Sequence, residues 1–141
     1  LAQLHSKGND DEKSTLNFRI AVCNSLLHKT AVPSVIYHFN LLDKLNSEKK
    51  HKLIPIYFLM ATCYMRLEFY DHAENLFIAL LTLLKAHLPY ALHKQAEVLL
   101  SLVNVYIGLM QFESASQSYQ AAELLIQNDT LDSMKNLRGA L

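Results

Sequence analysis

Apolar residues recur every three or four positions along most of the chain, the spacing that places them on one face of an α-helix. No run of alternating β-branched residues bounded by turn signals, which would indicate a strand, is found. Three glycines and three prolines interrupt the pattern at few points. The pattern therefore predicts an all-α protein. The expected helices are Thr15–His28, Val32–Leu45, Ile54–Leu67, Tyr70–Ala86, Tyr90–Leu109, Phe112–Gln127 and a short one from Leu131.

Prolines and a possible capping residue mark the ends of these helices, and the length of the chain predicts a single domain. Each of the three prolines falls near a proposed helix start, where a proline has no hydrogen bond to lose. Thr130 is expected to cap the last helix. Residues 1–14 are expected to form a flexible lead-in, and residues 15–141 a single domain. Because the chain opens with Leu1 instead of Met, we expect it to be a piece of a longer protein.

A set of three spaced residues recurs along the chain. It consists of a large residue, a small one nine positions later and a second large one four positions after that. Its copies are Tyr64, Ala73, Phe77, then Tyr106, Ala115, Tyr119, and more faintly Leu26, Val35, Phe39. A small side chain allows two antiparallel helices to approach closely, and large neighbours fill the remaining space. One short helix pair cannot bury its apolar face alone, so we expect successive pairs to stack.

This pattern resembles the tetratricopeptide-repeat (TPR) family. The second unit fits the family series of large, small and aromatic residues with Tyr57, Met60, Ala61, Tyr64, Tyr70, Ala73 and Phe77. The third unit fits it with Leu99, Leu102, Tyr106, Phe112, Ala115, Tyr119 and Ala122. The period is 38 residues from Leu26 to Tyr64 and 42 from Tyr64 to Tyr106, longer than the family's roughly 34. The resemblance implies an α-solenoid of about three antiparallel helix pairs plus a partial fourth, of the lengthened-repeat type.

The chain departs from the family at several points. Glu68 and Met110 occupy the positions where the family usually has a turn glycine, and Val103 is bulky where a small residue belongs. The closing proline of the repeat arrives four residues late, as Pro89. These departures and the long period predict extended helices and altered turns.

The resemblance also implies a binding surface. In TPR proteins the first helix of each pair lines a concave groove. The groove positions fall here on Asn24, His28, Phe58, Thr62, Met65, Arg66, Leu100, Asn104 and Ile107, with Ile20 and Leu27 beside them. Asn24, Thr62 and Asn104 occupy equivalent places. A side-chain amide can donate and accept at once, which matches one peptide unit of an extended ligand. These polar groups could equally be solvated and idle, and the lysine and arginine clamp that some family members use for a chaperone tail is absent.

Composition excludes several other classes of function. Thirteen basic residues balance thirteen acidic ones, so the chain lacks the charge excess of a protein that binds nucleic acid or anionic lipid. Its longest apolar run is too short for membrane insertion. Cys23 and Cys63 are too few and too far apart for a disulfide framework, so buried free thiols and a cytoplasmic location are expected.

No pattern typical of catalysis is found. The sequence contains neither a glycine-rich phosphate loop nor a nucleophile elbow, so an enzyme is not expected. The seven histidines are scattered over different predicted helices and links without a set of carboxylates. We therefore expect no metal site and no cofactor.

Three hypotheses of function remain open. The first is a scaffold that binds a protein or an extended peptide in the concave groove. The alternative is a ligand-responsive sensor segment of a larger bacterial signalling or transcription-regulatory protein. A third is a homodimer formed through exposed terminal helices, since the ends of a stack of helix pairs leave apolar faces uncovered.

Overall fold

The computed structural model of the chain describes the backbone of residues 2–27 and 32–140, and the side chains of residues 10–25 and 32–131. Over these ranges the protein is all-helical, as the apolar spacing predicts, and no strand occurs in them. The elements are α1 (Ala2–Leu27), α2 (Val32–Leu45), the short 3₁₀ helix η2 (Lys50–Leu53), α3 (Ile54–Arg66), α4 (Tyr70–His87), α5 (Leu92–Gly108) and α6 (Phe112–Ala140).

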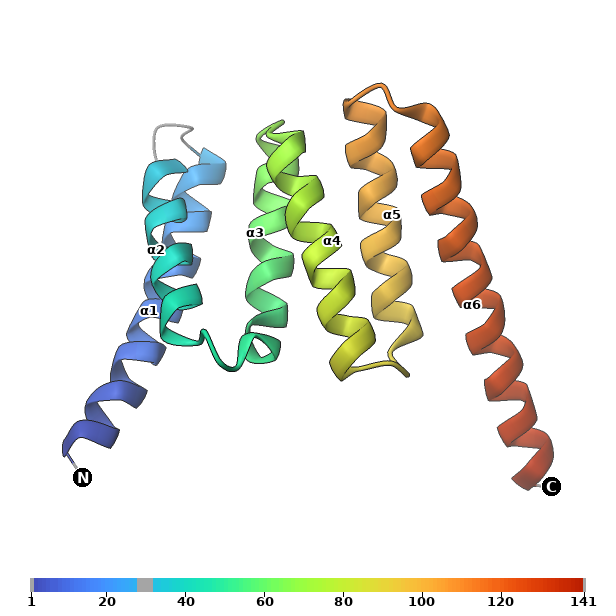
Figure 1. The fold of residues 1–141 in the computed structure, drawn as a ribbon, viewed down its shortest axis with the longest axis horizontal. Coiled ribbons are helices and arrows are strands. Elements are labelled where there is room, and N and C mark those ends of the chain that lie inside the picture. Colours follow the sequence, from blue (N-terminus) through green and yellow to red (C-terminus); the bar gives the residue numbers. More distant parts are fainter. Residues whose placement is uncertain (1, 28–31, 141) are drawn as a thin grey trace.

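The helices lie side by side in a row of three antiparallel pairs (Figure 1). The partners within each pair, α1 with α2, α3 with α4 and α5 with α6, pack along their lengths, and α4 also packs on α5. The first helices of successive pairs touch as well, α1 with α3 and α3 with α5. Consecutive elements are thus neighbours in space, and the two ends of the chain lie at opposite ends of the row.

One contact between α1 and α3 joins positions that the repeat makes equivalent. Ser25 and Cys63 are 38 residues apart, and their side-chain oxygen and sulfur lie 3.3 Å from each other in the buried interior. The Ser25 hydroxyl donates to the carbonyl oxygen of Val22 at 2.7 Å. Because that bond uses the hydroxyl proton, the Cys63 thiol is the donor in the contact with Ser25.

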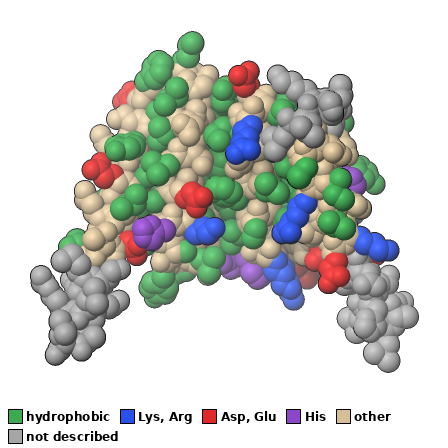
Figure 2. All heavy atoms as spheres, turned by 180° about the vertical axis from the view of Figure 1, so that it is seen from behind, with side chains coloured by type: hydrophobic (Ala, Val, Ile, Leu, Met, Phe, Trp, Pro, Cys, Tyr) green, Lys and Arg blue, Asp and Glu red, His purple; other side chains and the backbone are tan. Residues whose placement is uncertain are grey.

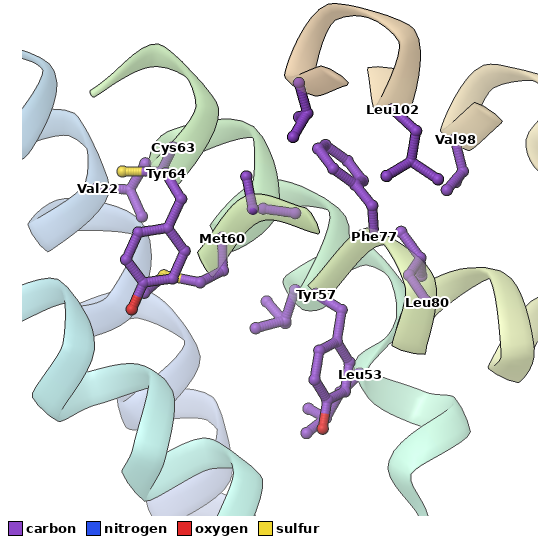
Figure 3. Close-up of a cluster of buried hydrophobic side chains, with 14 of the residues drawn as sticks. Val22, Leu53, Tyr57, Met60, Cys63, Tyr64, Phe77, Leu80, Val98 and Leu102 are labelled. Atoms are coloured by element: carbon purple, nitrogen blue, oxygen red, sulfur yellow. The ribbon is translucent and has the colours of Figure 1, made fainter. Parts of the chain in front are cut away.

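The small residues of the repeat are buried. Ala61 of α3 and Ala73 of α4 are fully inaccessible, and so is Ala122 of α6. Ala115 is only 6% exposed. Figure 3 shows the large residues that fill the core around them, with Tyr57 and Met60 from α3, Phe77 and Leu80 from α4, and Val98 and Leu102 from α5. The expectation that alanines lie buried in the core next to large side chains is confirmed.

Both turns within the second and third pairs have the same backbone geometry. Glu68 and Met110 adopt left-handed backbone angles, with φ of 66° and 60°. After α3, the Phe69 amide donates to Tyr64 and the Glu68 amide to Met65. After α5, the corresponding bonds run from Gln111 to Tyr106 and from Met110 to Ile107. These paired bonds form a Schellman motif, which normally has glycine at the left-handed position.

The structure corrects several expected helix ends. α1 begins at Ala2 and not near Thr15, so the segment expected to be a lead-in is helical. α6 runs without a break from Phe112 to Ala140, so no separate helix begins at Leu131 to open a fourth pair. Thr130 does not cap a helix, because its hydroxyl donates within α6 to the carbonyl oxygen of Ile126 at 3.0 Å.

The two cysteines differ in environment. Both are free thiols, but only Cys63 is buried, and Cys23 is exposed on α1. The prediction of a buried thiol is therefore wrong for Cys23. None of the described helices combines the length and the apolar character needed to cross a membrane.

Candidate functional site

The residues expected to form a groove lie on three neighbouring helices, α1, α3 and α5. We call this set, without His28, the inner-helix surface. On α1 it contains Asn24, on α3 Phe58, Thr62, Met65 and Arg66, and on α5 Leu100, Asn104 and Ile107. His28 lies outside the described residues. Asn24, Arg66 and Asn104 are exposed, and the α3 residues Phe58, Thr62 and Met65 are half-buried.

On α5, two apolar side chains flank an amide. Leu100 is 40% exposed and Ile107 is 50% exposed, although both are large aliphatic residues. Asn104 lies between them, about one helical turn from each, so the three side chains share one face of the helix. Within the described residues the Asn104 amide makes no hydrogen bond to the chain, and its donors and acceptor are available to a ligand.

Thr62 differs from the two asparagines at the equivalent positions. Its hydroxyl donates to the carbonyl oxygen of Phe58, one turn earlier in α3, at 2.8 Å. The hydroxyl proton is therefore engaged within the helix, and only the oxygen lone pairs face outward as acceptors. The polar part of the inner-helix surface thus consists of two full amides separated by one acceptor.

Phe58 connects the surface to the core. Its ring packs edge-on against Phe77 of α4, with ring centres 6.1 Å apart and planes at 75°. This is a favoured aromatic geometry, and it fixes the direction of the Phe58 ring. Phe58 also lines a cavity.

The cavity lies where α3 begins, α4 ends and α5 begins, and it has a volume of about 380 Å³. Its walls are His51, Ile54, Pro55, Phe58, Leu80, Leu84, Leu88, Lys94 and Val98. Apart from Phe58, these residues are not among the groove positions predicted from the sequence. The signal that could have located them is the late Pro89, which shows that α4 extends far enough for Leu84 and Leu88 to reach the start of α5.

Basic side chains and histidines gather at the edge of the molecule where the cavity lies, which is the lower edge in Figure 1. His51 stacks on His87, with ring centres 4.7 Å apart and planes at 27°, which ties η2 to the end of α4. Lys94 forms part of the cavity wall. The wider set at this edge is Lys44, Lys49, Lys50, Lys52 and Lys85. Figure 2 shows basic side chains and histidines, with some acidic ones among them, along the lower edge of the molecule, where these helix ends lie.

Two tyrosines, the buried Tyr57 and the half-buried Tyr106, have raised pKa values. The Tyr57 hydroxyl of α3 donates to the Asp43 carboxylate of α2. Burial, together with this hydrogen bond and the negative charge of Asp43, raises the pKa of Tyr57 above its usual range. Burial also raises the pKa of Tyr106, and the nearby Glu74 of α4 adds to the effect. Both phenols are thereby kept protonated, and the Tyr57 hydrogen bond links α3 to α2.

No described group of three or more His, Cys, Asp or Glu side chains is arranged to hold a metal ion. A scan against protein-family models finds none that matches this chain, and searches of curated proteins and of solved structures likewise find no match. The residues and geometry of the chain itself therefore carry the functional inference.

Proposed function

We propose that this chain is a TPR-like solenoid that binds an extended segment of another protein along α1, α3 and α5. The observation that carries the proposal is a pair of positions repeated on the three helices. An apolar residue is followed one turn later by a polar one, as Ile20 and Asn24, Phe58 and Thr62, and Leu100 and Asn104. All six side chains are exposed or half-buried.

This arrangement suits an extended peptide. An extended chain leaves its N–H and C=O groups without internal partners, and an asparagine amide can bond to both groups of one peptide unit. Ile20 and Leu100, which are 50% and 40% exposed, offer apolar area beside each amide for the side chains of the ligand. Burying that apolar area adds a hydrophobic contribution to the free energy of binding, which hydrogen bonds to the exposed asparagines alone would not provide.

The contacts among the inner helices support the solenoid part of the proposal. Ser25 and Cys63 meet at equivalent positions of α1 and α3, and α3 meets α5 in turn. Helices related in this way present the same face in the same direction, so the apolar and polar pairs line up from one unit to the next.

The proposal is tested with peptides selected from a random extended-peptide library on the unaltered chain. Asn104→Ala and Asn24→Ala each remove one amide, so each is expected to weaken binding by about 1 kcal/mol, roughly fivefold. The melting temperature should stay close to that of the unaltered chain, because both side chains are exposed. Fluorescence anisotropy measures the affinity.

Asn75→Ala is the matched control, because Asn75 is an exposed asparagine on α4, outside the inner-helix surface. It should leave the affinity unchanged. Equal affinity for the Asn104→Ala, Asn24→Ala and Asn75→Ala variants would contradict the proposal, and so would failure to select any peptide.

A further inference from the structure

The cavity between α3, α4 and α5 has the size of a small-molecule site. Its volume of about 380 Å³ falls within the roughly 300–1,000 Å³ usual for ligand pockets. An apolar cavity of about 150 Å³ already accommodates a benzene molecule, so this one holds a body larger than a single aromatic ring. Seven of its nine wall residues are apolar, and the other two are His51 and Lys94.

The polar part of the wall favours negative charge. Lys94 is exposed at the surface yet borders the cavity, and among the described residues it forms no ion pair. Glu97, the acidic residue one turn after Lys94 on α5, is exposed and does not pair with Lys94. Of the other acidic side chains near the cavity, Asp43 pairs with Lys50 at 3.8 Å and Asp129 with His93, whereas Glu48, in the link between α2 and η2, is exposed.

The helix ends add to this preference. α3 and α5 both begin at the cavity, with Ile54 and Lys94 in their first turns, and one helix, α4, ends there. The start of a helix carries a partial positive charge and its end a partial negative one. Two starts against one end leave a net positive contribution, in addition to the charge of Lys94.

We propose that this cavity binds a small amphiphilic anion, with its apolar body against Phe58, Leu80, Leu84 and Val98 and its carboxylate or phosphate head at Lys94. The size of the cavity favours a free small molecule over one side chain of a bound protein. The cavity shares one residue, Phe58, with the inner-helix surface, and its other wall residues lie outside that surface. Peptide binding and anion binding are therefore tested separately.

The test is direct titration of the chain with four probes that share one alkyl chain. Octanoate and octyl phosphate carry an anionic head, octanol a neutral one and octylamine a cationic one. Chemical shift changes of the cavity methyl groups report binding. At least one of the two anions is expected to bind at least tenfold tighter than octanol, and octylamine more weakly than octanol. Which anion binds tighter identifies the head group.

Two substitutions of Lys94 test whether its charge binds the head group of the ligand, apart from the apolar contacts of the cavity. Lys94→Met keeps most of the aliphatic stem but removes the charge, so it should reduce the affinity for the anion to that for octanol. Lys94→Arg should retain most of the affinity. Lys13→Met, at an exposed lysine on α1 that does not line the cavity, is the matched control and should change nothing.

Leu88→Phe tests the cavity itself. Leu88 is 47% exposed, so a larger side chain there can fill the opening without disturbing the core, and it should weaken octanol and both anions alike. Far-UV circular dichroism and the melting temperature check that each variant is folded. Equal affinity of octanol and the anions for the unaltered chain, or an unchanged anion affinity in folded Lys94→Met, would overturn the proposal, as would no saturable binding of any probe.

Discussion

Two residues, Glu68 and Met110, hold the backbone in the left-handed region at the turns that follow α3 and α5. A residue with a side chain pays about 1–2 kcal/mol for this conformation relative to its preferred one. Both turns nevertheless form the complete pair of Schellman bonds. The hydrogen bonds and the packing of the flanking helices therefore outweigh the local strain, and they do so at the same place in two successive units.

Replacing either residue with glycine should relieve that strain. Glu68→Gly and Met110→Gly are each expected to raise the free energy of unfolding by about 1 kcal/mol, since glycine adopts positive φ freely. Chemical denaturation followed by circular dichroism measures the change. Ala79→Gly, inside α4, is the control. It should lower the free energy of unfolding by about 0.5–1 kcal/mol, whereas the two turn substitutions should raise it. Destabilisation by both turn substitutions would contradict the assignment of strain.

The turn geometry shows what the sequence could and could not predict at this scale. The repeat pattern located both turn positions correctly. The missing glycines suggested an altered turn, but Glu68 and Met110 keep the geometry that glycine would have. Local propensity at one residue was overridden by the contacts of two helices, which cannot be evaluated from one position in the sequence.

Among the helices, the pair α3 and α4 depends on small residues in its core. Ala73 is fully buried on α4, and Ala61 is fully buried on α3. Phe77 follows Ala73 by one turn and is also fully buried, so a small and a large side chain lie next to each other on the buried face of α4. A larger residue at the small position would force the packed helices apart.

Ala73→Leu is therefore expected to lower the free energy of unfolding by about 1–3 kcal/mol. Ala79 lies on the same helix but is exposed, which makes Ala79→Leu a matched control with an expected effect within about 0.5 kcal/mol. Urea denaturation of both variants measures the difference. Similar stability of the two variants would show that Ala73 is not needed for close packing.

Most helix starts were predictable, and the outer ends of the row were not. α2, α3, α4 and α6 begin at the residues that the apolar spacing predicted. The errors concern α1, which starts earlier than expected, α5, which starts at Leu92 and not at Tyr90, and α6, which continues past Thr130. Thr130 bonds back to Ile126 and leaves the backbone helical, so a residue that resembles a cap does not end a helix by itself.

At the scale of the whole molecule, charge is balanced in number but not in position. The chain has thirteen basic and thirteen acidic residues. Lysines and histidines gather where α2 and α4 end and α5 begins (Figure 2). The opposite edge, formed by the turns between α3 and α4 and between α5 and α6, carries acidic residues, among them Glu68, Asp71 and Glu113. Net charge correctly argues against a strongly basic protein, yet it cannot show that one edge of the fold favours anions.

The two candidate sites differ in how far sequence could locate them. The inner-helix surface follows from spacing, because residues one turn apart on a helix share a face wherever the helix lies. The cavity instead brings together η2, the last turns of α4 and the first turns of α3 and α5. Its walls come from segments up to 47 positions apart, from His51 to Val98, and they meet only because the helices run in alternating directions.

The central claim is that α1, α3 and α5 together bind an extended segment of another protein. Backbone amide chemical shifts of the labelled chain, recorded while a library-selected peptide is added, test it most directly. We predict the largest shift changes on the inner-helix surface, around Asn24, Thr62 and Asn104 on all three helices. Changes confined to the exposed faces of α2, α4 and α6 would contradict the claim.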